Sequence, residues 1–333
     1  MFVELSHPHG KDSQGTRIIM ISRRNFVRAA VGGLAAAALP RHAFGMEAAF
    51  DRNARIGGLD FGVQTFSFNG LPNGDARIPT IIKCMHQVGI TACGIQSGHV
   101  EPPGRTETGW WITDRNLPGM RESRERARQW RLTVPSSYYT DLRSRFEAEG
   151  CRIDYFGMNF NETFTDAERE AELKAAKALG VKACYASIRL DECARLVPFV
   201  QAHQVRIAMH NHNNIHDPQE FGTAESLEKA LAMSEYFMVS LDIGHFTAGN
   251  NDSIAFIRKH HDRILNVHLR DRRKNNGPNT RFGEGDAPLA EVMRLIRDEK
   301  YPIDCFVEYE YGTLRTPVDE VNACFDYCRS VLT

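Results

Sequence analysis

Four side chains that can bind a divalent metal ion recur at similar places along the second half of the chain. His210, Asp242, His268 and Glu308 each end, follow or lie within a short apolar run that is typical of a strand. A single histidine or aspartate in a strand is more often a hydrogen-bonded structural group. Four of them at equivalent places on successive strands favour a metal site instead. Imidazoles and carboxylates suit ions such as Mn²⁺, Zn²⁺ or Co²⁺, so the sequence predicts one such ion here.

A site of this kind requires a fold in which the ends of neighbouring strands meet. From residue 59 onward, short β-type runs alternate with amphipathic helical stretches, and eight strand–helix units can be counted. The strands are continuous apolar runs, as expected when helices cover a parallel sheet. No glycine-rich phosphate loop follows the first strand, which disfavours a doubly wound open sheet. The pattern therefore predicts an α/β protein with a (β/α)8 TIM barrel, whose chemistry lies at the carboxyl ends of the strands.

The expected boundaries follow from the same alternation. Strands are predicted at 59–68, 91–96, 152–159, 181–186, 206–210, 237–242, 264–269 and 305–309. Helices are predicted at 78–88, 120–130, 139–149, 166–179, 191–203, 224–234, 253–260, 289–300 and 318–332.

Five short motifs resemble the sugar isomerase and epimerase superfamily, which has a xylose isomerase-like barrel. The resemblance covers the chain from about residue 59 to the end and is strongest between residues 206 and 310. It implies a carbohydrate substrate and one divalent ion, with Mn²⁺ favoured over Zn²⁺, Co²⁺ or Mg²⁺. The motifs are Ile207-Ala208-Met209-His210-Asn211-His212, Leu241-Asp242-Ile243-Gly244-His245, Val267-His268-Leu269-Arg270-Asp271, Phe282-Gly283-Glu284-Gly285 and Val307-Glu308.

The resemblance also implies a role for each metal ligand. Epimerases of this superfamily hold the ion with Glu, Asp, His and Glu from the last four strands, and Asp242, His268 and Glu308 match the last three. His210 departs from the first glutamate, so the two-glutamate acid/base pair is replaced here by His210 and Glu308. His245 resembles the substrate-binding histidine of the family, and we expect it to take part in catalysis.

Further polar or aromatic side chains are expected to contact the substrate because they follow predicted strands or lie in the long second loop. Simpler roles compete with this interpretation: a mutual surface ion pair for Arg270 and Asp271, a supporting contact for His212, and loop packing for the tryptophans. The predicted substrate-binding residues are His212, Arg270, Asp271, Gln96, Asn161, Glu162 and Trp111, with Trp110 beside the last.

These residues predict a metal-dependent isomerase or epimerase that acts on a free sugar or keto-sugar through an enediolate. The loss of one glutamate makes a lyase or hydratase of 3-keto-glycosides the main alternative. A nuclease related to endonuclease IV would need more metal ligands and a basic groove. A noncatalytic sugar-binding protein with a relic site is the remaining possibility, and the oligomeric state, including a homo-oligomer, stays open.

The amino-terminal region has a composition of its own. The chain carries 41 basic and 42 acidic side chains, yet residues 1–45 hold six basic and two acidic ones, so the remainder has a net charge near −5. This charge disfavours a nucleic-acid partner. Arg23 and Arg24, followed by an apolar run from Ala29 to Leu39, resemble a twin-arginine export signal, although an amphipathic helix of the domain is the alternative.

This signal predicts export by the twin-arginine machinery to the periplasm, without a stable membrane anchor. The expected organisation is a signal region at 1–45, a linker at 46–58 and the barrel at 59–333. Met20 could be the true start, in which case residues 1–19 are not translated. Eight cysteines lie in the barrel, mostly inside apolar patterns, and we expect them to be buried structural thiols.

Overall fold

The computed structural model describes residues 55–68, 70–72, 74–101, 120–158 and 160–333. The predicted export signal and the tryptophan pair in the second loop lie outside these residues.

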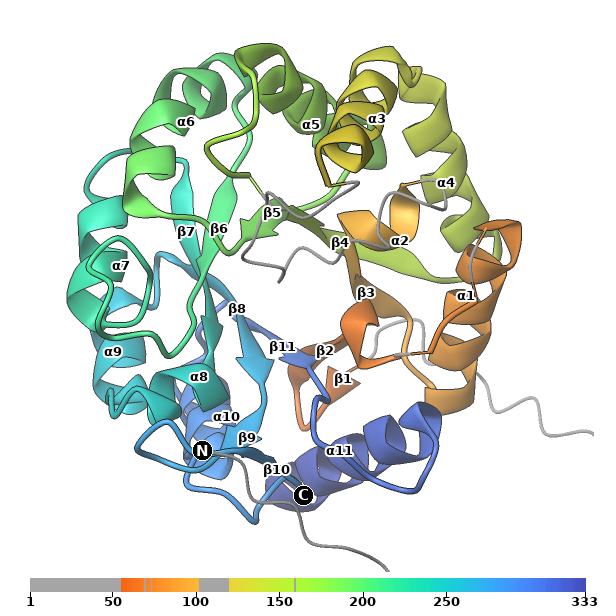
Figure 1. Ribbon diagram of the computed structural model, residues 1–333. Coiled ribbons are helices and arrows are strands. Elements are labelled where there is room, and N and C mark those ends of the chain that lie inside the picture. Colours follow the sequence, from red (N-terminus) through yellow and green to blue (C-terminus); the bar gives the residue numbers. More distant parts are fainter. Residues whose placement is uncertain (1–54, 69, 73, 102–119, 159) are drawn as a thin grey trace, which may run out of the picture. The chain divides into compact units, whose positions relative to one another are not determined.

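Eight parallel strands form a closed barrel, which confirms the predicted fold. Neighbouring strands are hydrogen-bonded in sequence order, and the barrel closes where the first strand pairs with both the second and the last. Figure 1 looks along the barrel and shows the strands at the centre inside a ring of helices. The barrel strands are β2 (Leu59–Gln64), β3 (Ala92–Gln96), β4 (Arg152–Met158), β5 (Ala183–Ala186), β6 (Ile207–His210), β7 (Phe237–Asp242), β8 (Ile264–Leu269) and β11 (Asp304–Val307).

Helices connect successive strands, and their bounds agree with the predicted ones to within a few residues. One additional helix lies between β3 and β4, where α3 and α4 both pack against α5. The main helices are α1 (Arg77–Val88), α3 (Met120–Thr133), α4 (Ser136–Ala148), α5 (Asp166–Leu179), α6 (Leu190–His203), α7 (Ala224–Leu231), α9 (Ser253–His260), α10 (Leu289–Asp298) and α11 (Pro317–Leu332).

Local sequence signals set several helix ends. Thr165, Thr223 and Thr316 each cap a helix through a reciprocal capping box with the residue three positions later. Gly89 and Gly180 end α1 and α5 in the left-handed conformation, at φ values of 70° and 71°. Glycine adopts this conformation without steric cost, so each helix can stop and the chain can enter the next strand.

The structure differs from the expected boundaries where elements are very short. The first barrel strand ends at Gln64 because the chain turns into a 3₁₀ helix at Thr65–Ser67. Residues before 59 also join the sheet, since β1 (Arg55–Ile56) pairs antiparallel with β2. The other short elements are α2 (Ser97–Val100), α8 (Ile243–Ala248), β9 (Asp271–Arg272) and β10 (Asn279–Thr280). Pieces of two to six residues have too few positions to show a hydrophobic period.

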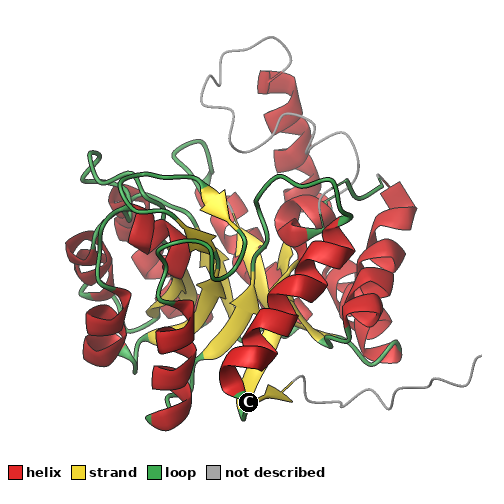
Figure 2. Cartoon of the chain, turned by 90° about the horizontal axis from the view of Figure 1, so that it is seen from below, coloured by secondary structure: helices red, strands yellow, loops and turns green. Residues whose placement is uncertain are grey.

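Apolar side chains fill both the inside of the barrel and the layer between strands and helices. The inner cluster takes residues from β3, β4, β5, β6, β7 and β11, among them Tyr155 and Phe306, whose rings meet edge to face with centroids 5.1 Å apart. Gly62 faces this cluster, and a Cβ there would lie 2.5 Å from the Phe306 ring. Seen from the side, helices flank the strands (Figure 2). The barrel interior is therefore a packed core and leaves room for a site only at its end.

The eight cysteines are free thiols, and seven of them are buried. Burial raises the pKa of several, to about 11 for Cys151, so these groups stay protonated and unreactive. This agrees with the expected structural role. Within the described residues, no helix combines the length and the apolar character that crossing a membrane requires.

Candidate active site

A cavity of about 290 Å³ lies at the end of the barrel where the predicted site residues gather. It is lined by Phe66, Gln96, Met158, Tyr185, Ser187, His210, His212, His245, Arg270, Glu308 and Glu310.

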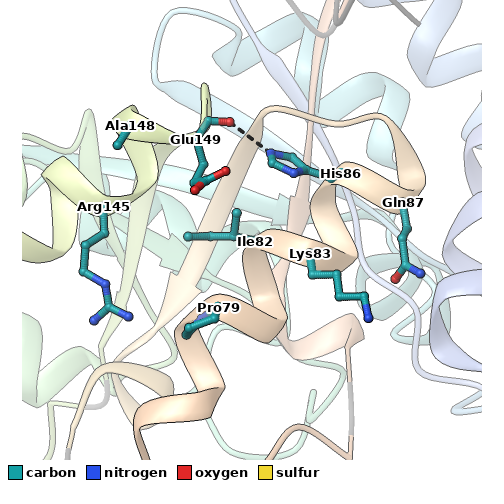
Figure 3. A pocket seen from close by; sticks show the side chains of 8 residues that line it. All are labelled: Pro79, Ile82, Lys83, His86, Gln87, Arg145, Ala148 and Glu149. Carbon is teal, nitrogen blue, oxygen red and sulfur yellow. Dashed lines mark hydrogen bonds between the residues drawn. The ribbon is translucent and has the colours of Figure 1, made fainter. Parts of the chain in front are cut away.

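A wider depression of about 580 Å³ lies elsewhere, between α1 and α4 (Figure 3). It contains none of the predicted site residues, and its polar groups include the pair His86 Nε2 and Glu149 backbone oxygen, 2.9 Å apart. The barrel-end cavity is therefore the candidate active site.

Strand register brings the four predicted metal ligands together. His210 and Asp242 are the last residues of β6 and β7, His268 lies opposite Asp242 in β8, and Glu308 directly follows β11. One ligand atom from each lies within 4.8 Å of those from the other three. All four residues are buried, with exposed fractions of 6% or less.

Arg270 forms ion pairs with three carboxylates at this site. Its Nε lies 2.8 Å from Asp242 Oδ2, its Nη2 lies 2.9 Å from Glu308 Oε2, and its Nη1 pairs with Glu310. The alternative of a mutual surface ion pair with Asp271 is therefore wrong, because Arg270 is 3% exposed and points into the site.

The charges of this cluster do not balance when its carboxylates are ionised. Three carboxylates share one guanidinium, and burial followed by the charge of Arg270 lowers the pKa of His212 to about 4, so this histidine adds no positive charge at neutral pH. Burial together with His268 lowers the pKa of His210 well below its usual value. When ionised, the three carboxylates carry more negative charge than the single guanidinium balances, and a divalent cation would supply positive charge there.

The pKa values of Glu308 and Asp242 are shifted in opposite directions. Burial would raise the pKa of Glu308, but the charges of Arg270 and His268 outweigh it and hold the pKa well below its usual range. For Asp242, burial is the largest effect and raises the pKa although Arg270 opposes it. These charges therefore favour the ionised form of Glu308.

The chemistry of the four side chains, with one unpartnered nitrogen among them, fits a metal ion. Among the described residues, His210 Nδ1 is buried and makes no hydrogen bond, whereas Asp242 Oδ2 forms an ion pair with Arg270. Buried polar atoms without partners are costly unless something else satisfies them. Two imidazoles and two carboxylates are a suitable set for Zn²⁺ or Mn²⁺. A second group, His210, His212 and His245, also has ligand atoms within 4.8 Å of one another.

Polar residues that the sequence reasoning missed hold the ring of His268. Its Nε2 lies 2.6 Å from Gln64 Nε2 and 3.0 Å from Ser240 Oγ, while its Nδ1 lies 2.7 Å from Glu308 Oε2. Such contacts fix the orientation of a ligand histidine. Gln64 ends an apolar strand, which is the signal that could have identified it.

Glu310 was also missed. It lines the cavity and pairs with Arg270, two residues beyond Glu308.

The remaining predicted substrate-binding residues divide into two groups. Gln96 and His212 line the cavity with Arg270. Asn161 accepts hydrogen bonds from the backbone and hydroxyl of Thr163, and Glu162 is exposed; neither is among the described cavity-lining residues. Trp111 and Trp110 lie outside the described residues.

Asp271 is turned away from the cavity and holds a loop. Its carboxylate accepts hydrogen bonds from the backbone N–H groups of Gly283, Gly285 and Ala287, at 2.8, 2.9 and 3.2 Å. The substrate-binding role predicted for Asp271 has no support in this geometry.

We expect Asp271→Asn to lower the free energy of unfolding by about 1–3 kcal/mol, because an amide nitrogen cannot accept the backbone hydrogen bonds. Urea unfolding measures this. The control is Asp286→Asn, which removes an exposed carboxylate that accepts from the Lys274 backbone N–H and from Arg273. Equal losses in the two variants would contradict a specific role for Asp271.

Comparison with known proteins agrees with this fold. A family model described as xylose isomerase-like TIM barrel matches residues 158–329. No curated protein matches the chain by sequence. Similar solved structures include the IolI protein with a bound zinc atom, with a TM-score of 0.58 and 14% identity over 82% of this chain and 97% of that one.

Two further structures are similar to a comparable extent. An L-ribulose 3-epimerase has a TM-score of 0.57 and 12% identity over 82% of this chain and 94% of its own. A probable 3-DHS dehydratase, AsbF from Bacillus anthracis, has a TM-score of 0.55 and 12% identity, covering 80% and 98% of the two chains. At these identities the similarity establishes the shared fold.

Proposed function

Because this chain belongs to the xylose isomerase-like TIM barrel family, we propose that it is a metal-dependent isomerase or epimerase acting on a free sugar or keto-sugar. The observation that carries the proposal is the meeting of His210, Asp242, His268 and Glu308 at the barrel end, where His210 and Glu308 also line the cavity. The sugar epimerase and the zinc-containing protein among the similar structures support it.

The four residues would hold one divalent ion, with Mn²⁺ as the first expectation. A divalent ion bound there would polarise a carbonyl oxygen and so acidify the neighbouring C–H bond. Glu308 is placed to remove that proton as the general base, since its carboxylate is buried and ionised. Return of that proton from Glu308 to the other carbon of the resulting enediolate would complete isomerisation and regenerate the base. Epimerisation would instead need a solvent proton on the opposite face, relayed by His210, while His245 would donate a hydrogen bond to a substrate oxygen.

The charges lining the cavity favour a substrate without phosphate. Among the described lining residues Arg270 is the only lysine or arginine, and its guanidinium already contacts three carboxylates. A phosphate group would meet these carboxylates without a free cation to bind it. The lack of an uncommitted cation among the described lining residues also disfavours binding of a nucleic-acid backbone. A free sugar also accords with the proposed export to the periplasm.

A lyase or hydratase acting on 3-keto-glycosides is the second candidate. The observation that favours it is His210, an imidazole with a lowered pKa where an epimerase would place a second glutamate. One carboxylate base is enough to remove a proton before a β leaving group departs. A dehydratase is among the structurally similar proteins.

Solvent deuterium exchange distinguishes these functions. The Mn²⁺-loaded protein is incubated in D₂O with a panel of free and 3-keto sugars, and the products are identified by mass spectrometry and NMR. Deuterium beside the carbonyl with no loss of a group supports the isomerase or epimerase. An unsaturated product supports the lyase. Absence of both, in protein that retains the ion, would contradict an enzymatic function on these sugars.

A further inference from the structure

We infer that Arg272 fixes the tautomer of His245, so that the ring presents an Nε2–H donor to the substrate. Arg272 is thus a positioning residue that acts through His245. The inference rests on the proposed function for its role in catalysis, but the tautomer itself is a property of the protein without substrate.

Arg272 is itself held firmly. It is 9% exposed and lies in β9, directly after Asp271, whose carboxylate holds the loop at residues 283–287. Its Nε and Nη2 donate to the backbone oxygen of Gly277 at 3.2 and 2.7 Å. These two bonds leave Nη1 pointing to the side chains of Asn213 and His245, at 3.0 and 2.7 Å.

The contact between Arg272 and His245 defines where the imidazole proton lies. A guanidinium has only donors, so at 2.7 Å it requires Nδ1 of His245 to be an acceptor without a proton. A neutral imidazole that accepts at Nδ1 carries its proton on Nε2.

Among the described residues, the opposite tautomer, with the proton on Nδ1 of His245, would have only the side-chain amide of Asn213 as a partner, and this contact is longer. Asn213 Oδ1 lies 3.1 Å from His245 Nδ1 and could accept a proton from it. That arrangement would set the Nδ1–H against Nη1 of Arg272, which is closer. Asn213 Oδ1 is already satisfied by Arg272, and its Nδ2 donates to Asn276. If the amide were reversed, Nδ2 would face Nδ1 and again require it to accept.

This tautomer also affects the group of three histidines that could hold a metal ion. A ring nitrogen that carries a proton cannot bind a metal, and His245 Nδ1 is occupied by Arg272. The group of three histidines therefore loses one member, whereas the group of His210, Asp242, His268 and Glu308 does not include His245. His245, which lines the cavity beside them, becomes a donor to a substrate oxygen.

The decisive measurement uses the unmodified protein. The chain is labelled with ¹⁵N-histidine and loaded with diamagnetic Zn²⁺, and long-range ¹H–¹⁵N spectra are recorded; comparison with His245→Gln identifies the His245 signals. We expect the pattern of an unprotonated Nδ1 and a protonated Nε2. An Nδ1–H tautomer, an imidazolium, or a metal-bound Nε2 would overturn the inference. Because no substrate is present, failure of the proposed reaction would leave this result unaffected.

Variants test the consequence for catalysis. Arg272→Met should mix the two tautomers and lower kcat about 10–100-fold, as is usual for residues that orient a functional group, with KM and metal content changing much less. Arg272→Lys keeps one donor and should restore part of both the spectrum and kcat. Arg273→Met is the matched control, since Arg273 is exposed and pairs with Asp286. An Arg272→Met protein with an unchanged His245 spectrum would contradict the role of Arg272.

Discussion

Glu308→Gln is expected to slow proton exchange into the substrate by roughly 10²–10⁴-fold, the usual contribution of a general base. The amide keeps the shape of the side chain but cannot accept the proton. Because His210, Asp242 and His268 stay in place, metal content should fall only modestly. Initial rates of deuterium incorporation, with metal analysis of the same samples, measure both effects.

Glu310→Gln is the matched comparison for this variant. It removes another carboxylate from Arg270 but leaves the proposed base intact, so its loss of rate should be much smaller. Full activity in Glu308→Gln would rule out Glu308 as the base. Equal losses in the two variants would indicate that both act through the charge of Arg270.

Arg270→Met is expected to produce the largest change in stability. Without the guanidinium, Asp242, Glu308 and Glu310 face one another with no countercharge. Removing one partner of a buried ion pair typically costs about 3–5 kcal/mol. We expect a loss of this size in the free energy of unfolding of the metal-free protein, measured by urea unfolding in the presence of EDTA.

The metal should reverse part of this loss. A divalent cation would compensate the same carboxylates, so saturating Mn²⁺ should stabilise Arg270→Met more than it stabilises the wild type. Arg273→Met, on the surface nearby, should behave as the wild type does. If Mn²⁺ stabilised Arg270→Met no more than the wild type, the carboxylates and the ion could not be sharing one site.

The meeting of His210, Asp242, His268 and Glu308 could be predicted from sequence because the strand patterns fix which residues stand at the carboxyl ends. Side chains alternate along a strand, so His268 and Arg270 point to the same side, while Asp271 points to the other. Applied to the segment after β8, this rule separates the arginine in the cavity from the aspartate that holds the loop. Glu308 and Glu310 are likewise two residues apart, and both contact Arg270.

Other features depend on contacts that no sequence pattern expresses. Gln64 reaches His268 from the first barrel strand, which only closure of the barrel brings near β8, and Ser240 reaches it from the neighbouring strand β7. The contact between Arg272 and His245 requires the hairpin of β9 and β10, whose strands have two residues each. Asn161 follows a strand, as a site residue would, but caps its own turn instead.

Equilibrium dialysis against Mn²⁺ tests the central claim most directly, because the roles proposed for His210, Asp242, His268 and Glu308 depend on the metal. The comparison protein is the double variant Asp242→Asn/His268→Gln, checked for folding by circular dichroism. We predict one ion per chain in the wild type and none in the double variant at the same free concentration. A wild-type protein that retains no Mn²⁺, Zn²⁺ or Co²⁺, or a double variant that binds as well as the wild type, would contradict the account.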